Sequence, residues 1–222
     1  MAIYDPIKQQ VVDIYRTLIN RGYLKTAEGN ISLRIPGQSA FAITPSSYDY
    51  VKMQAQDICV LDLEVNRLEG EMKPSIESGM HAAVYQNRAD VQTIIHTHQV
   101  YASALAVINT PIPALFDEQV RFLGRRVEII PYAPSGTSFL KNNVRRKIQN
   151  GSNAYILQNH GVLIFGGTTE RAIANMALLE KCALVYLLAL CTERKVTKIP
   201  LGVREITLAK LRKDEQKYDQ SE

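Results

Sequence analysis

Three of the four histidines in this 222-residue chain have a spacing that suits a metal site. His96 and His98 flank one threonine at the end of a predicted strand. Side chains two apart on a strand share a face, so both imidazoles can converge on one ion. His160 follows Asn159 in a turn between two apolar segments and can add a third nitrogen. Three imidazoles with an open position are typical of catalytic metal sites. The alternative is that these rings only pack and hydrogen-bond.

The carboxylate best placed to act beside such an ion is Glu77. Pro74 and Ser75 precede it and predict the start of a helix, where the helix dipole favours a negative charge. Glu77 is therefore either a first-turn capping charge, or a general base or extra ligand beside a metal. His81 lies four residues later on the same helical face. It can serve as a fourth ligand, as a partner of the groups around the ion or as a packing residue, and we favour the last two.

The elements that would position these residues alternate between helical and extended patterns. The segment 5–21 predicts a helix with Asp5 as N-cap, Pro6 at the first helical position and Gly22 after its end. Further helices are predicted over 78–86, 101–107, 139–149, 170–191 and 205–217, and strands over 30–35, 40–44, 58–63, 91–98, 127–130, 154–158 and 162–165. The sequence therefore predicts one domain, residues 1–222, of the α/β class (layered in the α+β manner), with a central mixed or antiparallel sheet flanked by helices.

Composition and charge exclude several kinds of partner. The net charge of +4 is too small to argue for nucleic-acid binding. Three cysteines without metal-type spacing indicate reduced thiols, and the first residues lack a signal-peptide pattern, so we expect a cytoplasmic protein. The apolar segment 172–191 is interrupted by charges, so we expect a core helix and no membrane partner. Its expected core positions are Met176, Leu179, Cys182, Leu187, Leu190 and Cys191.

Six short motifs occur in the order found in the class II aldolase/adducin-head family. They are Glu28-Gly29-Asn30-Ile31-Ser32, Ile43-Thr44-Pro45-Ser46-Ser47, Lys73-Pro74-Ser75-Ile76-Glu77, His96-Thr97-His98, Pro131-Tyr132-Ala133-Pro134-Ser135-Gly136-Thr137 and Asn159-His160-Gly161. Each motif is weak alone, but together they span the chain, and the chain resembles that family over its whole length.

The resemblance implies a set of site residues and partners. A divalent metal, most often zinc and otherwise Mn²⁺, Co²⁺ or Fe²⁺, would be held by His96, His98 and His160, with Glu77 as the acid/base that also touches it. A phosphate pocket would be built from Gly29, Asn30, Ser46, Ser47 and Ser75. The implied substrate is a small phosphorylated sugar, and the implied assembly is a homotetramer with its sites at subunit interfaces.

The implied activity is reversible cleavage of a ketose 1-phosphate to dihydroxyacetone phosphate and an aldehyde through a metal-stabilised ene-diolate. Alternatives within the family are a sugar-phosphate 4-epimerase, a decarboxylase or dehydratase, and a non-catalytic adducin-like oligomerisation module. The chain departs from the aldolase pattern at Ile76, which replaces a serine, and at Ser47, which replaces a glycine. Asp117 replaces a tyrosine of the neighbouring subunit. It is either an acid/base or a solvated charge, and we favour the latter.

Overall fold

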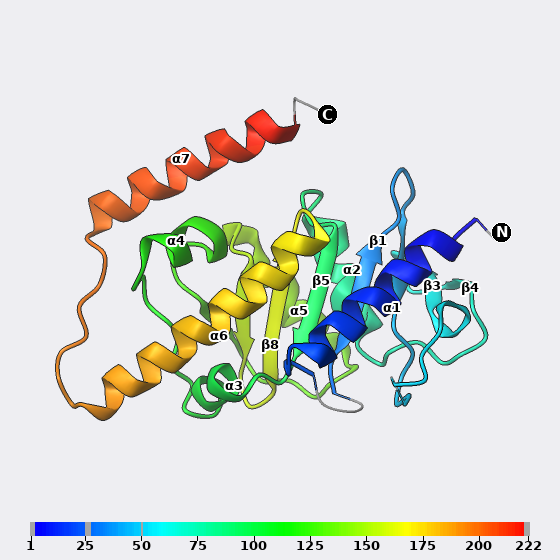
Figure 1. Cartoon of the computed structure of the whole chain (residues 1–222), viewed down its shortest axis with the longest axis horizontal. Coiled ribbons are helices and arrows are strands. Elements are labelled where there is room, and N and C mark those ends of the chain that lie inside the picture. Colours follow the sequence, from blue (N-terminus) through cyan, green and yellow to red (C-terminus); the bar gives the residue numbers. More distant parts are fainter. Residues whose placement is uncertain (1–2, 25–27, 50, 220–222) are drawn as a thin grey trace.

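A computed structural model describes residues 3–24, 28–49 and 51–219, with side chains up to residue 210. The strands form one sheet, and the helices pack around it (Figure 1). The helices are α1 (Asp5–Asn20), α2 (Ser78–Asn87), α3 (Val100–Val107), α4 (Asp117–Leu123), α5 (Ser138–Lys147), α6 (Thr169–Cys191) and α7 (Leu201–Asp219), with short 3₁₀ turns at Ala55–Asp57 and Ile148–Asn150. The strands are β1 (Asn30–Arg34), β2 (Ala40–Ile43), β3 (Cys59–Asp62), β4 (Arg67–Glu69), β5 (Thr93–Thr97), β6 (Glu128–Ile130), β7 (Ala154–Leu157) and β8 (Gly161–Gly166).

Within the described residues, eight strands form one mixed sheet in the order β4-β3-β2-β1-β5-β8-β7-β6. Neighbouring strands are antiparallel except β6 and β7, which are parallel. The expected fold class, a layered fold with one mixed sheet flanked by helices, is therefore confirmed. Strand β5 lies in the middle, between β1 and β8, so both neighbours can place side chains beside its end.

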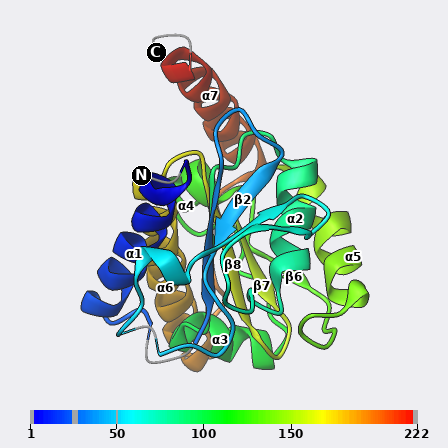
Figure 2. The ribbon, with the colours of Figure 1, turned by 90° about the vertical axis from the view of Figure 1, so that its right-hand side faces the viewer.

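Helices cover both faces of the sheet, and each face has its own apolar core (Figure 2). Helices α1, α3 and α6 pack on one face, where Ile95 of β5 is buried among them. Helices α2 and α5 pack on the other face, which receives Ile94. This alternation follows from the two-residue period of a strand. His96 therefore points toward the face that α2 covers.

Every helix and strand expected from the sequence is present, and the structure adds one strand, one α-helix and the 3₁₀ turn at Ala55–Asp57. Strand β4 and helix α4 are too short to show a clear periodicity, and each is held by its neighbours in the fold. The N-cap of α1 is Tyr4, so the assignment of Asp5 as the cap was wrong by one residue. Pro6 still lies in the first helical turn, where its missing N–H costs no hydrogen bond.

Helix α6 is the one helix of the described chain with the length and apolar composition of a membrane span. It packs instead on β8 and β5 and against α3 and α4, as the core helix of a soluble protein does. The expectation that Leu190 and Cys191 belong to the core was wrong, because both are exposed, and Leu187 is only partly buried. The last turns of α6 extend beyond the sheet, so their apolar side chains are not covered by the core.

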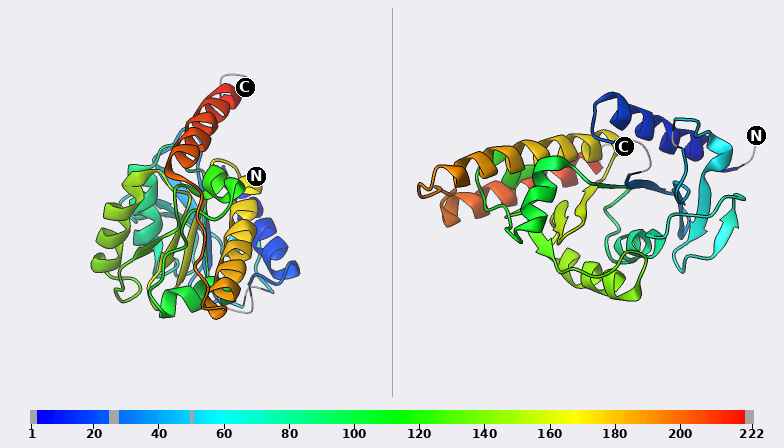
Figure 3. Two further views of the ribbon diagram at one scale, coloured as in Figure 1. Left: turned by 90° about the vertical axis from the view of Figure 1, so that its left-hand side faces the viewer. Right: turned by 90° about the horizontal axis from the view of Figure 1, so that it is seen from below.

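Helix α7 extends away from the body of the molecule, as the left view of Figure 3 shows. Its first half packs against α4. The Arg125 guanidinium that follows α4 forms a salt bridge with the Glu205 carboxylate, with a closest N–O distance of 2.8 Å. This contact fixes the start of α7 to the end of the sheet that carries β6 and β7.

Candidate active site

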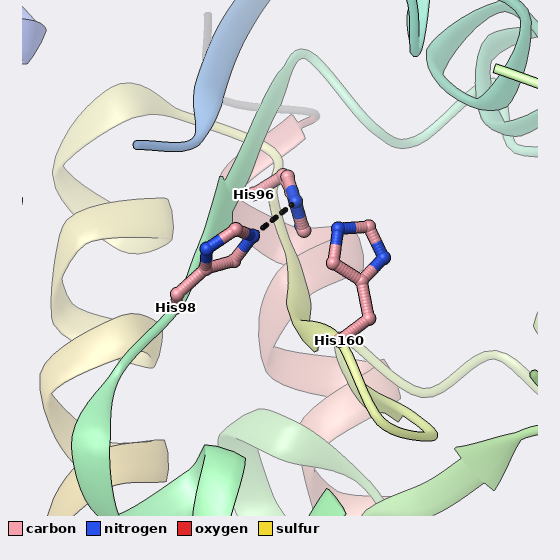
Figure 4. A group of neighbouring side chains, drawn as sticks. All are labelled: His96, His98 and His160. Carbon is pink, nitrogen blue, oxygen red and sulfur yellow. Dashed lines mark hydrogen bonds between the residues drawn. The ribbon is translucent and has the colours of Figure 1, made fainter. Parts of the chain in front are cut away.

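The three predicted metal ligands lie together beside the end of β5 (Figure 4). Each offers one ring nitrogen, and the three nitrogens lie within 4.8 Å of one another. The Nε2 atoms of His96 and His98 are 3.3 Å apart. His96 is buried, whereas His98 is exposed and His160 is half-buried. The cluster is thus closed on the protein side and open to solvent on the other.

Strand pairing explains why His160 reaches this point. Strands β7 and β8 form a hairpin, and β8 pairs with β5 so that His96 faces Leu163. The hairpin turn, with Asn159 at φ 53°, therefore lies beside the end of β5. Gly161 makes the close approach possible, because a Cβ there would lie 2.5 Å from the Thr97 carbonyl oxygen. The backbone of the turn thus allows His160 to project next to its two partners.

The ring of His96 is held in one orientation by the backbone of β8. Its Nδ1–H donates to the Val162 carbonyl oxygen at 2.8 Å. The Nε2 lone pair is then directed at the cluster, an arrangement that commonly orients histidine ligands of metals. Val162 was not among the residues that the sequence indicated, because a backbone carbonyl leaves no signal in residue type.

The Glu77 carboxylate turns toward the histidines rather than capping its helix. Glu77 is the N-cap residue of α2, but its side chain makes no capping hydrogen bond within the described chain. Its Oε2 lies 3.2 Å from His96 Nε2, and its Oε1 lies 3.5 Å from His160 Nε2. The residue is 5% exposed, and Oε1 has no hydrogen-bond partner among the described residues. This oxygen is therefore available to a ligand or a proton.

Electrostatics keep the imidazoles neutral and the carboxylate ionised. Burial, together with His96, lowers the pKa of His160 to about 4 despite the opposing effect of Glu77. Burial also lowers the pKa of His96 and of His98. Burial alone would raise the pKa of Glu77, but positive charge on His96 or His160 and the hydrogen bond from the Asn30 amide lower it more, to about 2. Neutral imidazoles and an ionised carboxylate are the forms that bind metal ions.

These residues fit a divalent cation. Three neutral ring nitrogens converge, and the orphaned oxygen of Glu77 lies beside them. An imidazole and carboxylate donor set suits Zn²⁺, Co²⁺, Fe²⁺ or Mn²⁺. His81 does not belong to the ligand set, because its Nε2 contacts Asn30 Oδ1 at 2.6 Å and its Nδ1 contacts Ser32 Oγ at 2.7 Å. It therefore partners the groups around the site, one of the two roles favoured from the sequence.

The segments predicted to bind phosphate meet next to Glu77. Ser46 N–H donates to the Lys73 carbonyl oxygen at 2.8 Å, and Ser75 N–H donates to the Thr44 carbonyl oxygen at 3.2 Å. These bonds join the two serine-containing segments. The Ser75 hydroxyl oxygen also accepts from Glu77 N–H at 3.2 Å, which links this segment to the start of α2.

The remaining predicted phosphate residues also border this region. Gly29 and Asn30 lead into β1, where Asn30 pairs with His96 across the two strands. Asn30 donates from Nδ2 to Glu77 Oε2 at 2.9 Å. Ser47 is exposed and has φ 52°, so it keeps the left-handed backbone that a glycine would adopt without strain.

Two residues that depart from the aldolase pattern are exposed. Asp117 lies on the first turn of α4, where a carboxylate is favoured by the helix dipole. Its exposure agrees with the interpretation as a solvated charge in a single chain. Ile76, next to Glu77, is 53% exposed.

A model of the class II aldolase and adducin N-terminal domain matches residues 9–187. The chain is a member of the class II aldolase and adducin family. It is 31% identical over 179 residues to a 5-deoxy-D-ribulose 1-phosphate aldolase from Bacillus thuringiensis serovar kurstaki, covering 81% of this chain and 83% of that enzyme. It is 30% identical over 184 residues to an L-fuculose phosphate aldolase from Escherichia coli O6:H1, covering 83% of this chain and 84% of that one.

A solved L-fuculose 1-phosphate aldolase has the same fold as this class II aldolase family member. The TM-score is 0.87 at 32% identity, and the match covers 93% of this chain and 96% of that structure. The relatives and the structural neighbour are aldolases, which are lyases. The protein is therefore a class II aldolase-type lyase related to enzymes of sugar phosphates.

Proposed function

We propose that this protein is a divalent-metal-dependent aldolase that reversibly cleaves a ketose 1-phosphate to dihydroxyacetone phosphate and an aldehyde. The observation that carries the proposal is the meeting of three imidazole nitrogens with the orphaned Oε1 of Glu77. An ion held by His96, His98 and His160, most often zinc in such donor sets, supplies the Lewis acidity that polarises the substrate carbonyl.

Glu77 moves the proton at carbon. In the direction of condensation, its Oε1 removes a proton from C3 of dihydroxyacetone phosphate, and the aldehyde oxygen gains a proton as the C3–C4 bond forms. In the direction of cleavage, the C4 hydroxyl loses its proton as the C3–C4 bond breaks, and Glu77, having taken up one proton, delivers it to C3. The carboxylate is ionised at neutral pH because its pKa is held near 2. Asn30 engages Oε2 at 2.9 Å, which leaves Oε1 as the oxygen that reacts.

The phosphate is assigned to the segments that meet beside Glu77. Backbone N–H groups and hydroxyls can hold a phosphate by hydrogen bonds without a lysine. Gly29, Asn30, Ser46, Ser47 and Ser75 are the residues proposed for this role, and Ile76 removes one hydroxyl from it. A variant with Ser75 replaced by alanine is expected to raise KM for the phosphorylated substrate more than it lowers kcat.

The substrate proposed is a short ketose 1-phosphate. Two relatives are named for 5-deoxy-D-ribulose 1-phosphate and for L-fuculose phosphate. A suitable panel of test substrates contains these two sugar phosphates, D-ribulose 1-phosphate and D-fructose 1-phosphate. The metal-loaded protein is expected to release an aldehyde from at least one of them, and a chelator is expected to abolish the release. No turnover of the panel by protein with bound metal would refute the proposal.

Product analysis separates the aldolase from the other reactions of the family. The aldolase yields two products, whereas an epimerase returns one isomeric sugar phosphate and a decarboxylase or dehydratase releases CO₂ or water. NMR spectra of the reaction mixture distinguish these products. We expect an Asp117→Asn variant to keep its aldolase activity, and a loss of turnover there would support an acid/base role at Asp117 instead.

We further propose a cytoplasmic homotetramer with the sites at subunit interfaces. Its support is a set of exposed apolar side chains on two helices that pack together, here called the α3–α6 surface: Val100, Tyr101 and Val107 of α3, Ile108 at its C-cap, and Val185 and Leu188 of α6. Exposed apolar side chains that gather on neighbouring helices are typical of protein–protein contacts. Light scattering on the purified protein is expected to give four times the chain mass of 24.9 kDa.

A further inference from the structure

Buried polar side chains from β1 and from α2 with its N-cap form one hydrogen-bonded row, which ends at the Glu77 carboxylate. We call Asn30, Ser32, Glu77, His81 and Tyr85 the polar zipper. Asn30 and Ser32 are two apart on β1, so they share a face. Glu77, His81 and Tyr85 are four apart along α2 and its N-cap, so they also share a face.

The distance between successive zipper residues along α2 is close to that along β1, so the two sets of side chains stay in register. Four residues of an α-helix rise about 6 Å, and two residues of a strand rise about 6.6 Å. Each β1 side chain therefore lies between two α2 side chains. Asn30 contacts Glu77 and His81, and Ser32 contacts His81 and Tyr85. All five side chains are buried.

The contacts of Asn30 with Glu77 and with His81 determine which atoms of this row carry protons. An ionised carboxylate only accepts hydrogen bonds, so the Asn30 amide must present its Nδ2 to Glu77. The Asn30 Oδ1 then faces His81 Nε2 at 2.6 Å. This oxygen can only accept, so His81 must carry its proton on Nε2.

The remaining links follow from the same rule. His81 is completely buried, and burial lowers its pKa to about 3, so it is neutral at neutral pH. Its Nδ1 is then an acceptor, and Ser32 Oγ donates to it at 2.7 Å. With its own proton directed at His81, the Ser32 oxygen accepts from the Tyr85 hydroxyl at 2.8 Å, and the Gln92 carbonyl oxygen is a second, longer acceptor for the same hydroxyl at 3.3 Å. The donors of Ser32, His81 and Asn30 therefore all point in one direction, which ends at Glu77.

We propose that His81 is a positioning residue that fixes the Asn30 amide and, through it, the Glu77 carboxylate. The Asn30 amide cannot rotate by half a turn, because its oxygen would then face the carboxylate and its nitrogen would face a donor. Glu77 is thus held by Oε2, and Oε1 stays directed toward His160. This inference rests on the proposed aldolase function, in which Oε1 moves the proton.

Two substitutions at position 81 separate positioning from packing. His81→Gln places an amide N–H near the position of Nε2, so it can still donate to Asn30 Oδ1. His81→Phe keeps a planar ring of similar size but loses the donor. We expect His81→Phe to lower kcat by roughly 10–100-fold with little change in KM and in bound metal. We expect His81→Gln to keep most of kcat.

Tyr155→Phe serves as a control for the loss of a buried hydrogen-bonding group outside the polar zipper. Tyr85 ends the polar zipper, and Tyr155 lies buried in the same core with its hydroxyl bonded to Asn150. Tyr155→Phe is expected to lower stability without changing kcat per bound metal. A fall in kcat for Tyr155→Phe as large as that for His81→Phe would overturn the inference, because any buried polar loss would then explain it.

A spectroscopic measurement tests the inference without any variant. Selective ¹⁵N-histidine labelling of the metal-loaded wild-type protein reports which ring nitrogen of each histidine is protonated. We expect Nε2–H for His81. An unprotonated Nε2, or a folded and metal-loaded His81→Phe with wild-type kcat, would overturn the positioning role. If the wild-type protein cleaves no ketose 1-phosphate, the aldolase proposal fails, whereas the labelled spectrum still decides the direction of the polar zipper.

Discussion

At the scale of single residues, the environment of one carboxylate carries most of the chemistry. Glu77 is buried, yet it keeps its charge because Asn30 and two histidines stabilise it more than burial destabilises it. One of its oxygens is engaged by Asn30, and the other has no hydrogen bond from the described residues. Burial of an unpaired acceptor costs free energy, so its persistence indicates a functional role.

Replacement of Glu77 by glutamine tests its role as the base. Glu77→Gln keeps the shape of the side chain but cannot accept a proton, so we expect kcat to fall by roughly 10²–10⁴-fold. Bound metal, measured by elemental analysis, should remain because the three histidines are unchanged, whereas His96→Ala should lose it. Glu180→Gln is a matched control, because the Glu180 carboxylate accepts from the N–H groups of Tyr101 and Ala102 at the start of α3.

The buried His81 predicts a pH dependence of stability. Burial lowers its pKa in the folded protein to about 3, below the ordinary value of 6.5, so the unfolded chain binds a proton more readily between these values. The contribution of neutral His81 to stability is therefore present above pH 6.5 and is lost as the pH falls toward 3.

Comparison with His81→Gln isolates this effect from other titrating groups. Urea unfolding at a series of pH values is expected to show the stability advantage of wild type over His81→Gln shrinking as the pH falls from 7 to 4. A constant difference across that range would contradict the assigned neutral state.

At the scale of elements, two positive φ angles shape the loops that border the site. Gly29 leads into β1 at φ 78°, and a Cβ there would lie 2.3 Å from the His96 carbonyl oxygen. This contact sets how closely β1 approaches the histidine end of β5. Ser47 adopts φ 52° with an ordinary side chain, so its loop carries strain that Gly29 avoids.

Gly29→Ala should both strain the backbone and push β1 away from β5. We expect it to lower the free energy of unfolding by about 1–3 kcal/mol and to weaken metal binding. Gly37→Ala is the matched control, since Gly37 has φ 70° and open space around its Cβ position. Urea unfolding and metal content of the two variants should differ, and equal effects would mean that the close approach is unimportant.

Ser47→Gly is expected to relieve strain. A left-handed conformation costs a non-glycine residue about 1–2 kcal/mol, and the greater freedom of glycine in the unfolded chain offsets part of the gain. We therefore expect a stabilisation of up to about 1 kcal/mol. The adjacent Ser46→Gly, where φ is not positive, should instead destabilise the protein. A loss of stability for Ser47→Gly in urea unfolding would contradict the strain argument.

At the scale of the whole molecule, one half of α6 belongs to the core and the other half does not. Its first turns are buried on the sheet, while Val185 and Leu188 join exposed residues of α3 on the α3–α6 surface. An apolar surface of this kind disfavours an isolated chain in water. The exposed apolar residues at the end of α6 therefore agree with the proposed assembly of several chains.

A charge on the α3–α6 surface should disrupt that assembly. Leu188 is 60% exposed in the single chain, so Leu188→Lys costs little in folding but places a lysine in the proposed contact. We expect light scattering to show a smaller particle with unchanged circular dichroism. Val51→Lys, at an exposed residue on another segment, should leave the assembly intact. An unchanged mass for Leu188→Lys would exclude this surface as the interface.

The sequence by itself determined the elements and much of the candidate site. Alternation along the segment 91–98 was enough to place His96 and His98 on one side, because strand periodicity is a local property. The apolar periods also located each long helix and strand. Short elements such as β4 and α4 were missed because their existence depends on neighbours rather than on their own pattern.

Only the tertiary structure decided how distant segments use their polar groups. The pairing of β1 with β5 places Asn30 beside His96, and the packing of α2 on β1 turns Glu77 from its helix toward the histidines. His81 became a hydrogen-bonding partner rather than a ligand for the same reason. Local spacing predicts on which face of a helix or strand a side chain lies. Which residues pack against that face depends on long-range strand pairing and helix packing, and no local pattern encodes these.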